Sequence, residues 1–372
     1  MGFGDWDKLI LGLYLAGVTL FGYLARGRVA STRDFFLAGR RAPWWLACVS
    51  IVATETSTLT FVALPGIAFA GDISFLQVVL GFLLGRVAVA LFLVPAYTRG
   101  RLATSYELIS RRLGRGAQRA ASGVFCLTRL LGDGVRLLSA CLVLEEILDL
   151  TLGRAPGNDL AAVGVIGLLT LVYTVTGGMR AVLWTDFIQL LLYLAGGGLA
   201  LHLALQSIPG GMGGLWEAAG AAGKLDLLEF APESFFGGLS IYSGLLGGAL
   251  LSMATHGTDQ LIVQRLLACR SPRAARAAMV GSGVLVLLQM AFFLLVGLAL
   301  WGFYRERGLA GRIEQKEVFA RFLVNELPSG LSGLIVAAAF AAAMSTLSSS
   351  LSSLASATVK SPFRASIAGL TS

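Results

Sequence analysis

The chain has 372 residues, of which 56% are hydrophobic and only 13% are charged. A soluble domain carries about 25% charged residues, so the composition argues against a soluble protein. The net charge of +8 comes mainly from arginines that cluster between apolar runs. This pattern is typical of membrane topology rather than of nucleic-acid binding. The sequence therefore predicts an all-α, polytopic membrane protein whose environment is a lipid bilayer, with no nucleic-acid partner.

Nine apolar segments are long enough to cross a bilayer as helices. They cover residues 7–25, 44–70, 74–97, 118–149, 158–176, 180–206, 238–265, 277–303 and 331–357. They predict one transmembrane domain over residues 1–359 and a short tail at 360–372. The loop at 304–330 is expected to hold a short amphipathic helix on the outer face, and Trp216 in the Gly-rich loop 207–237 suggests an interfacial anchor.

Arginine is dense in the connections after the first, third and seventh predicted spans. The positive-inside rule places these connections in the cytoplasm. The N-terminus is then expected outside and the tail in the cytoplasm, in the plasma membrane or, in a bacterium, the inner membrane. The connection after the seventh span is expected to contain Arg265, Arg270, Arg273 and Arg276.

The end of the last span is crowded with hydroxyl groups between Ala341 and Val359. Ser345, Ser349, Ser352 and Ser353 share one face at helical spacing. Hydroxyls can bond back to a carbonyl of the preceding turn, and small residues allow close helix packing. Neutral oxygen atoms also suit a small hard cation that binds and leaves. Both interpretations, packing and a cation site, stay open for this stretch alone.

Two predicted spans contain polar interruptions. The span 44–70 holds Glu55, and a carboxylate near the bilayer centre costs roughly 2.5–3.5 kcal/mol unless a partner, an ion or water offsets it. The span 238–265 holds His256 and Asp259, and Gly257 is the expected interruption. His256 is interpreted as a satisfied polar residue. Two interrupted helices five spans apart indicate an inverted-repeat transporter.

Other charged residues within the predicted spans also indicate a functional membrane protein. In the fourth span Asp133 lies within one helical turn of Arg129 and Arg136, which predicts either a local ion pair or a solute contact. Asp186 in the sixth span, with Gln189 three residues later, is an intramembrane acid and is interpreted as functional.

No catalytic or metal-binding motif stands out. The cysteines show no metal spacing and are expected to be packing residues; they are Cys48, Cys126, Cys141 and Cys269. No nucleophile–base pair or phosphate loop is present, so neither an enzyme nor a cofactor is predicted.

Several segments resemble the solute:sodium symporter family. They are STRDFFLAGRRAPWW (31–45), TSYELISRRLG (104–114), YTVTGGMRAVLWTDFIQ (173–189), GTDQLIVQRLL (257–267) and MSTLSS (344–349). The resemblance runs from about residue 5 to 359 and implies a leucine-transporter-type fold of five plus five helices with one extra helix in front. The nine spans correspond to the extra helix and core helices one to eight. The second repeat is therefore expected to be incomplete, as in a fragment, a truncated gene product or a degenerate member.

The resemblance also implies ligands for sodium as the coupling ion. The family's sodium site falls on the carbonyls of Ala53, Thr56 and Ala342 and on the hydroxyls of Ser345 and Thr346. In some members a second sodium is held by residues corresponding to Asp186, Ser345, Ser348 and Ser349. Solute or coupling roles are expected for Glu55, Ser57, Thr60 and Gln77, with ordinary packing as the alternative for the last three. Sugar transporters of the family usually have Asn at position 55, so Glu55 argues against a sugar.

These features predict sodium-coupled symport of a small polar organic solute. One rival is a proton-coupled transporter that uses Glu55 or Asp186 as the carrier. The other is a truncated membrane protein that does not transport.

Overall fold

The computed structural model describes residues 4–25, 31–56, 58–99, 102, 104–152, 158–230, 240–315, 317–327 and 330–360. Within these ranges the regular structure is helical, apart from a single bridge between Ala42 and Cys269. The prediction of an all-α helix bundle is confirmed. Ser57 lies outside the described residues.

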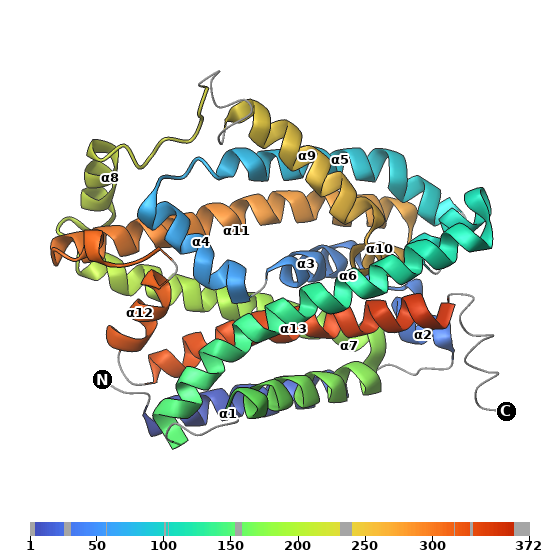
Figure 1. Ribbon diagram of the computed structural model, residues 1–372, viewed down its shortest axis with the longest axis horizontal. Coiled ribbons are helices and arrows are strands. Elements are labelled where there is room, and N and C mark those ends of the chain that lie inside the picture. Colours follow the sequence, from blue (N-terminus) through green and yellow to red (C-terminus); the bar gives the residue numbers. More distant parts are fainter. Residues whose placement is uncertain are drawn as a thin grey trace.

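The helices follow one another along the chain as shown in Figure 1. They are α1 (Asp5–Leu24), α2 (Thr32–Leu37), η1 (Ala38–Arg40), α3 (Trp44–Glu55), α4 (Thr58–Ala70), α5 (Leu76–Arg99), α6 (Ser105–Leu152), α7 (Asn158–Gln206), α8 (Gly211–Ala221), α9 (Ile241–Thr258), α10 (Gln260–Ala268), α11 (Pro272–Glu306), η3 (Ala310–Arg312), α12 (Val318–Asn325) and α13 (Leu331–Lys360). Among the described helices, α1, α5, α7 from Val163, α11 and α13 to Val359 are each long and apolar enough to cross a membrane.

Two long helices bend sharply at glycines with positive φ. Gly114 in α6 has φ 87°, and Gly178 in α7 has φ 56°. Glycine is needed there because a side chain disfavours this backbone region. The bend at Gly178 separates the two segments that the sequence predicts as the spans 158–176 and 180–206.

Two further segments are broken rather than bent. The first break lies at Thr56, between α3 and α4, where the backbone is extended with φ −77° and ψ 98°. The helix then continues through Pro65 to Ala70. With 12 residues, α3 is only about 18 Å long, so it needs α4 to cross a membrane.

The second break lies at Asp259, two residues after the expected position at Gly257. Asp259 is extended, with φ −66° and ψ 123°, and its carboxylate caps α10 by accepting a hydrogen bond from the amide of Leu261. Gly257 remains helical, and its carbonyl accepts a hydrogen bond from the Tyr97 hydroxyl. The helix breaks at Asp259, whose side chain can accept a hydrogen bond from a free amide at the start of α10, and not at the flexible glycine.

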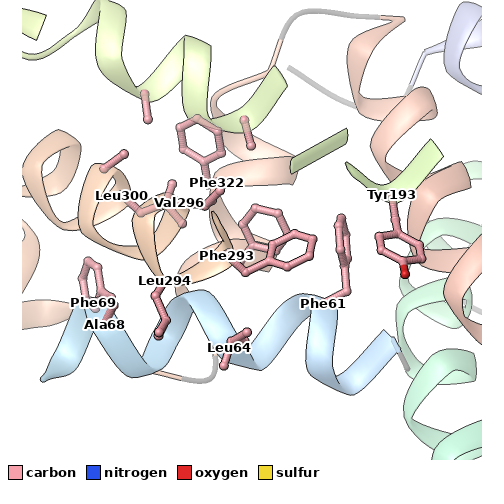
Figure 2. Packing of buried hydrophobic residues seen from close by; sticks show 14 of the residues in the cluster. Phe61, Leu64, Ala68, Phe69, Tyr193, Phe293, Leu294, Val296, Leu300 and Phe322 are labelled. Carbon is pink, nitrogen blue, oxygen red and sulfur yellow. The ribbon is translucent and has the colours of Figure 1, made fainter. Parts of the chain in front are cut away.

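The main core surrounds Phe61 of α4 (Figure 2). Its ring packs edge-to-face against Phe293 of α11, with 5.5 Å between centroids. It packs in the same way against Phe319 of α12, at 5.2 Å. Tyr193 of α7 completes this aromatic contact at 6.4 Å. The short helix expected in the loop 304–330 is therefore α12, and it buries its aromatic side chains in the core. The loop 207–237 holds α8, which the sequence analysis does not predict.

The position of α13 decides where the hydroxyl groups lie. This helix packs against α1, α3, α6, α7 and α10, and Figure 1 shows it running alongside α6 and α7. The serines of its second half are buried. Of the cysteines, Cys48 and Cys269 are buried, unbridged packing residues and Cys126 is half-buried; the side chain of Cys141 is outside the described residues.

Candidate functional site

The hydroxyl groups of α13 divide into two groups. Ser348 donates to the carbonyl of Ser345, and Ser353 donates to the carbonyl of Ser350, each at 3.0 Å. These two bonds stay within the helix, although Ser348 also contacts the Tyr173 hydroxyl of α7. Several other hydroxyls of the run reach neighbouring helices, so the serine run has more than one role.

One neighbour is α10, which meets α13 along a polar seam. The amide of Gln264 donates to Ser352 Oγ at 3.1 Å, and the amide of Gln260 donates to Ser356 Oγ at 2.8 Å. All four side chains are buried. Side-chain hydrogen bonds of this kind hold helices together inside membranes. The packing interpretation therefore holds for this end of the serine run.

The other important neighbour is the end of α3 at the first break. Thr346 Oγ1 donates to the carbonyl of Thr54 at 3.3 Å and lies 3.2 Å from the carbonyl of Ala342. Thr54 Oγ1 and Ser349 Oγ are hydrogen-bonded at 2.9 Å. The last turn of α3 is therefore pinned to the turn of α13 that carries the expected sodium ligands.

The backbone at this junction supplies carbonyl oxygen atoms. Because α3 ends at Glu55, the regular hydrogen-bond pattern of a continuous helix stops at its last turn. Thr56 is held in place by two contacts: its hydroxyl donates to the Val52 carbonyl at 3.0 Å and accepts from the amide of Gln289 at 2.6 Å. Ala53 and Ala342 are fully buried. Neutral oxygens of this kind suit a hard cation.

Ser345 is oriented by Asp186 of α7. Its hydroxyl donates to Asp186 Oδ1 at 2.6 Å, and both side chains are fully buried. Because the proton of Ser345 is committed to the carboxylate, both lone pairs of its oxygen remain for another partner. This contact leaves the Ser345 oxygen with lone pairs at the junction of α3 and α13, where the sequence predicts a sodium ligand.

Two of the expected ligands of a second sodium ion, Asp186 and Ser349, contact Arg265. The sequence predicts Arg265 in a cytoplasmic loop. That expectation is wrong, because α10 continues to Ala268 and Arg265 is fully buried. Its guanidinium pairs with Asp186 at 3.1 Å and also donates to Ser349. The available signal was an arginine within the apolar segment QLIVQRLL and a buried acid that needed a partner.

Glu55 has protein partners of its own. It forms an ion pair with Arg86 of α5, and its Oε1 lies 2.6 Å from Nε2 of His256 in α9. Arg86 is fully buried and also donates to Ser282 of α11 at 2.8 Å. His256 Nδ1 lies 3.1 Å from the Ser252 carbonyl. The structure thus brings four helices together at the Glu55 carboxylate, and the sequence analysis did not identify Arg86 as its partner.

The remaining expected solute residues lie in different surroundings. Gln77 is fully buried, and its side-chain oxygen accepts a hydrogen bond from the Glu229 amide at 3.0 Å, which ties the segment before α9 to α5. Thr60 is partly buried on α4, one turn beyond the first break.

A cavity of about 200 Å³ lies beside the second break. Phe125, Thr128, Arg129, Gly132, Asp133, Arg136 and Asp259 line it. Arg129 is bound by Asp133 at 2.9 Å, by Asp259 at 3.5 Å and by Ser350 of α13 at 3.0 Å. Arg136 lies 3.8 Å from Asp133 and is 44% exposed. The expected ion pairs within α6 are confirmed, and they form the wall of a cavity.

Comparison with known proteins gives consistent matches. The model of the sodium:solute symporter family matches residues 35–365. The human sodium/iodide cotransporter is 29% identical over 367 residues, which is 96% of this chain and 56% of that protein. The sodium/sialic acid symporter SiaT of Proteus mirabilis (strain HI4320) is 28% identical, over 95% of this chain and 70% of that protein.

A solved structure is similar over nearly the whole chain. It is a Na⁺-coupled sialic acid symporter in a substrate-bound, outward-open state, with a TM-score of 0.85 and 27% identity. The match covers 97% of this chain and 75% of that one. The chain thus spans a little more than half of the human relative and about three quarters of the solved one.

Proposed function

Because the chain belongs to the sodium:solute symporter family, we propose that it couples the inward movement of sodium to the uptake of a small polar organic solute. It is a multi-pass membrane protein with the fold of a Na⁺-coupled symporter. The distribution of arginines supports an outside N-terminus and a cytoplasmic C-terminus, in the plasma membrane or the bacterial inner membrane. No cofactor is proposed beyond sodium itself.

The observation that carries this proposal is the contact between Thr346 and Thr54. It sets the hydroxyl face of α13 against the end of α3, which supports a site built from the oxygen atoms of both helices. The proposed ligands are the carbonyls of Ala53, Thr56 and Ala342 and the hydroxyls of Ser345 and Thr346. Broken helices that expose carbonyls beside another helix are a known basis for sodium sites in transporters.

Sodium is favoured over a proton as the coupling ion because the candidate proton carriers are already ion-paired. Glu55 contacts the buried Arg86, and Asp186 contacts the buried Arg265. Each carboxylate is thus already engaged by the fixed positive charge of an arginine.

The energy of sodium entry suffices to drive solute uptake. One charge crossing 100 mV gains about 2.3 kcal/mol, and a tenfold sodium gradient adds about 1.4 kcal/mol.

The proposed solute site is the cavity between α6 and the second break. Arg136 offers the least engaged guanidinium in its wall, which suits an anionic group on the solute. Relatives of this chain include sodium-coupled monocarboxylate and sialic acid transporters. Ser57 and Thr60, just past the first break, are proposed as further contacts. Glu55 is proposed to couple the two breaks, and Gln77 is proposed as a solute contact.

The first experiment measures the binding of radioactive sodium to the purified chain. Wild type is compared with the double variant Ser345→Ala, Thr346→Ala and with Ser353→Ala, whose hydroxyl only bonds back to its own helix. We expect saturable binding in the wild type and in Ser353→Ala, and at least tenfold weaker binding in the double variant. Binding that is unaffected by the double substitution would overturn the proposed site.

A transport assay then tests the coupling. The chain is reconstituted in liposomes, and uptake of small labelled carboxylates is driven by a sodium gradient or, separately, by a pH gradient. Uptake driven by sodium alone supports the proposal, whereas uptake driven by the pH gradient without sodium favours the proton-coupled rival. Sodium binding without uptake of any solute favours the non-transporting rival.

A further inference from the structure

We propose that the surface where the start of α3, the end of α10 and the start of α11 meet binds the headgroup of an anionic phospholipid. Four exposed arginines and one exposed tryptophan form this surface, which is called the arginine surface below: Arg41, Arg270, Arg273, Arg276 and Trp44. The distribution of arginines along the chain places it at the cytoplasmic leaflet. The inference goes beyond the proposed transport function and uses none of the sodium or solute residues.

A short backbone bridge brings two of these arginines together from distant parts of the sequence. The amide of Ala42 donates to the Ala268 carbonyl at 3.0 Å, and the amide of Arg270 donates to the Ala42 carbonyl at 3.2 Å. Arg41 and Arg270 therefore flank the same bridge. They belong to the connections after the first and seventh predicted spans, and the positive-inside rule expects both connections on the same side of the membrane.

The first two turns of α11 add Arg273 and Arg276, because this helix begins at Pro272. Arg273 shares one helical face with Val284 and Leu288, and all three are exposed. Since α11 is long and apolar enough to cross a membrane, this exposed apolar face lies against the lipid chains. Arg273 precedes Val284 by about three helical turns, which places its guanidinium near the level of the headgroups.

Trp44 lies beside this face of α11. A Cβ atom at Gly281 would be 3.5 Å from the Trp44 ring, so the ring packs against α11. Trp44 is nevertheless 44% exposed. A tryptophan that is packed on one side and exposed on the other is typical of the interface between headgroups and lipid chains. A lipid whose headgroup contacts the arginines can therefore lay its acyl chain along Trp44 and Val284.

The arginine surface carries a positive charge that its surroundings do not neutralise. The two stretches that form it contain no Asp or Glu, from Phe35 to Thr54 and from Gln260 to Arg305. Within the part of the chain that the structure describes, none of the four guanidiniums forms an ion pair.

The chemistry of the arginine surface favours a lipid over a soluble anion. Guanidinium groups bind phosphate with two parallel hydrogen bonds, and basic surfaces between helices on the cytoplasmic side bind anionic headgroups. A soluble phosphate would use only the arginines. A phospholipid also uses the exposed ring of Trp44 and the apolar face of α11, so it matches both halves of the surface.

The test measures how brominated lipids quench tryptophan fluorescence of the full chain reconstituted in phosphatidylcholine vesicles. The brominated fraction is either phosphatidylglycerol or phosphatidylcholine. We expect brominated phosphatidylglycerol to quench more strongly at the same fraction, because it collects beside Trp44. Trp44→Phe is expected to reduce this excess quenching. No excess in the wild type, or an unchanged excess in Trp44→Phe, would overturn the inference.

A pair of matched variants then tests the arginines. Arg273→Gln combined with Arg276→Gln is expected to weaken the preference for phosphatidylglycerol about fivefold or more, because each arginine near an anionic surface adds to the attraction. Arg112→Gln combined with Arg115→Gln is the control, since it removes the same charge from exposed positions of α6. The control is expected to keep the preference.

Two further outcomes of these measurements would overturn the inference. Equal losses in the two double variants would show a diffuse attraction between the membrane and all exposed arginines, with no defined site. Excess quenching that inorganic phosphate abolishes at constant ionic strength would identify a soluble anion as the ligand. The comparison with Trp44→Phe keeps the test decisive where Arg273→Gln, Arg276→Gln does not fold.

Discussion

The carboxylate of Asp7 in α1 accepts a hydrogen bond from the backbone amide of Gly333 in α13 at 2.6 Å. It also accepts one from the amide of Gly330 at 2.8 Å. A negative side chain at a helix N-terminus satisfies free amides and stabilises the helix dipole. The helices α1 and α13 approach so closely that a Cβ atom at Gly333 would lie 2.5 Å from the Asp7 Cα. The first helix thus anchors the helix that carries the serine run.

Asp7→Ala is therefore expected to lower stability by about 1–2 kcal/mol, because it removes a buried cap and leaves two amides unsatisfied. Thermal unfolding of the purified protein in detergent measures the effect. Asp5→Ala is the control, since the Asp5 side chain is 99% exposed and pairs with the neighbouring Lys8 on the same helix. Equal shifts in the two variants would show that Asp7 does not cap α13.

A second prediction concerns the close crossing of α5 and α9, which Figure 1 shows side by side. A Cβ atom at Gly248 would lie 2.4 Å from the Val78 carbonyl, whereas one at Gly247 would meet nothing within 4 Å. Gly248→Ala is expected to cost about 1–3 kcal/mol through overpacking. Gly247→Ala, one residue away on the same helix, is expected to be neutral or slightly stabilising. Thermal unfolding of both variants measures the two changes in stability. An unchanged stability of Gly248→Ala would contradict this close packing.

A third prediction concerns the ion pair of Glu55 and Arg86. Removing one partner of a buried pair costs about 3–5 kcal/mol because the other charge is left uncompensated. The loss of stability in Glu55→Gln is expected near the lower end of this range, since the Glu55 side chain is 20% exposed and Arg86 is not exposed at all.

Adding Arg86→Met to Glu55→Gln should recover part of the lost stability. The double-mutant cycle isolates the pairwise term. Additive effects of the two substitutions would contradict a direct ion pair between these residues.

A fourth prediction follows from Lys224, in the segment between α8 and α9. Its ammonium donates to the carbonyls of Phe69 at 2.8 Å and Gly71 at 2.6 Å, at the end of α4. Burial lowers the pKa of Lys224 from its ordinary value of 10.5, and the nearby Asp72 partly opposes the shift.

The folded chain therefore releases this proton at a lower pH than the unfolded chain does. Between the two pKa values the unfolded state binds more protons, so stability is expected to rise with pH in this window. Chemical unfolding at several alkaline pH values measures the slope. Lys224→Met should give a flatter dependence, and an unchanged slope would contradict the lowered pKa.

The sequence by itself was enough for the helical class, for the two polar interruptions and for the buried hydroxyl face. These are local properties: apolar length, a charge within an apolar run and helical spacing can all be read from neighbouring residues. The short helix between α11 and α13 was predictable for the same reason.

The partners of the buried charges were decided only by the tertiary structure. Arg265 contacts Asp186, which lies 79 positions away in the sequence, and Arg86 contacts Glu55, which lies 31 positions away. Which carboxylate faces which guanidinium depends on how packed helices are rotated and shifted relative to one another, and local sequence pattern carries no record of that. For the same reason the serines of one helix face could be recognised as a group. Only the packing of α3, α7 and α10 against α13 separated the proposed sodium ligands from the hydroxyls that join helices.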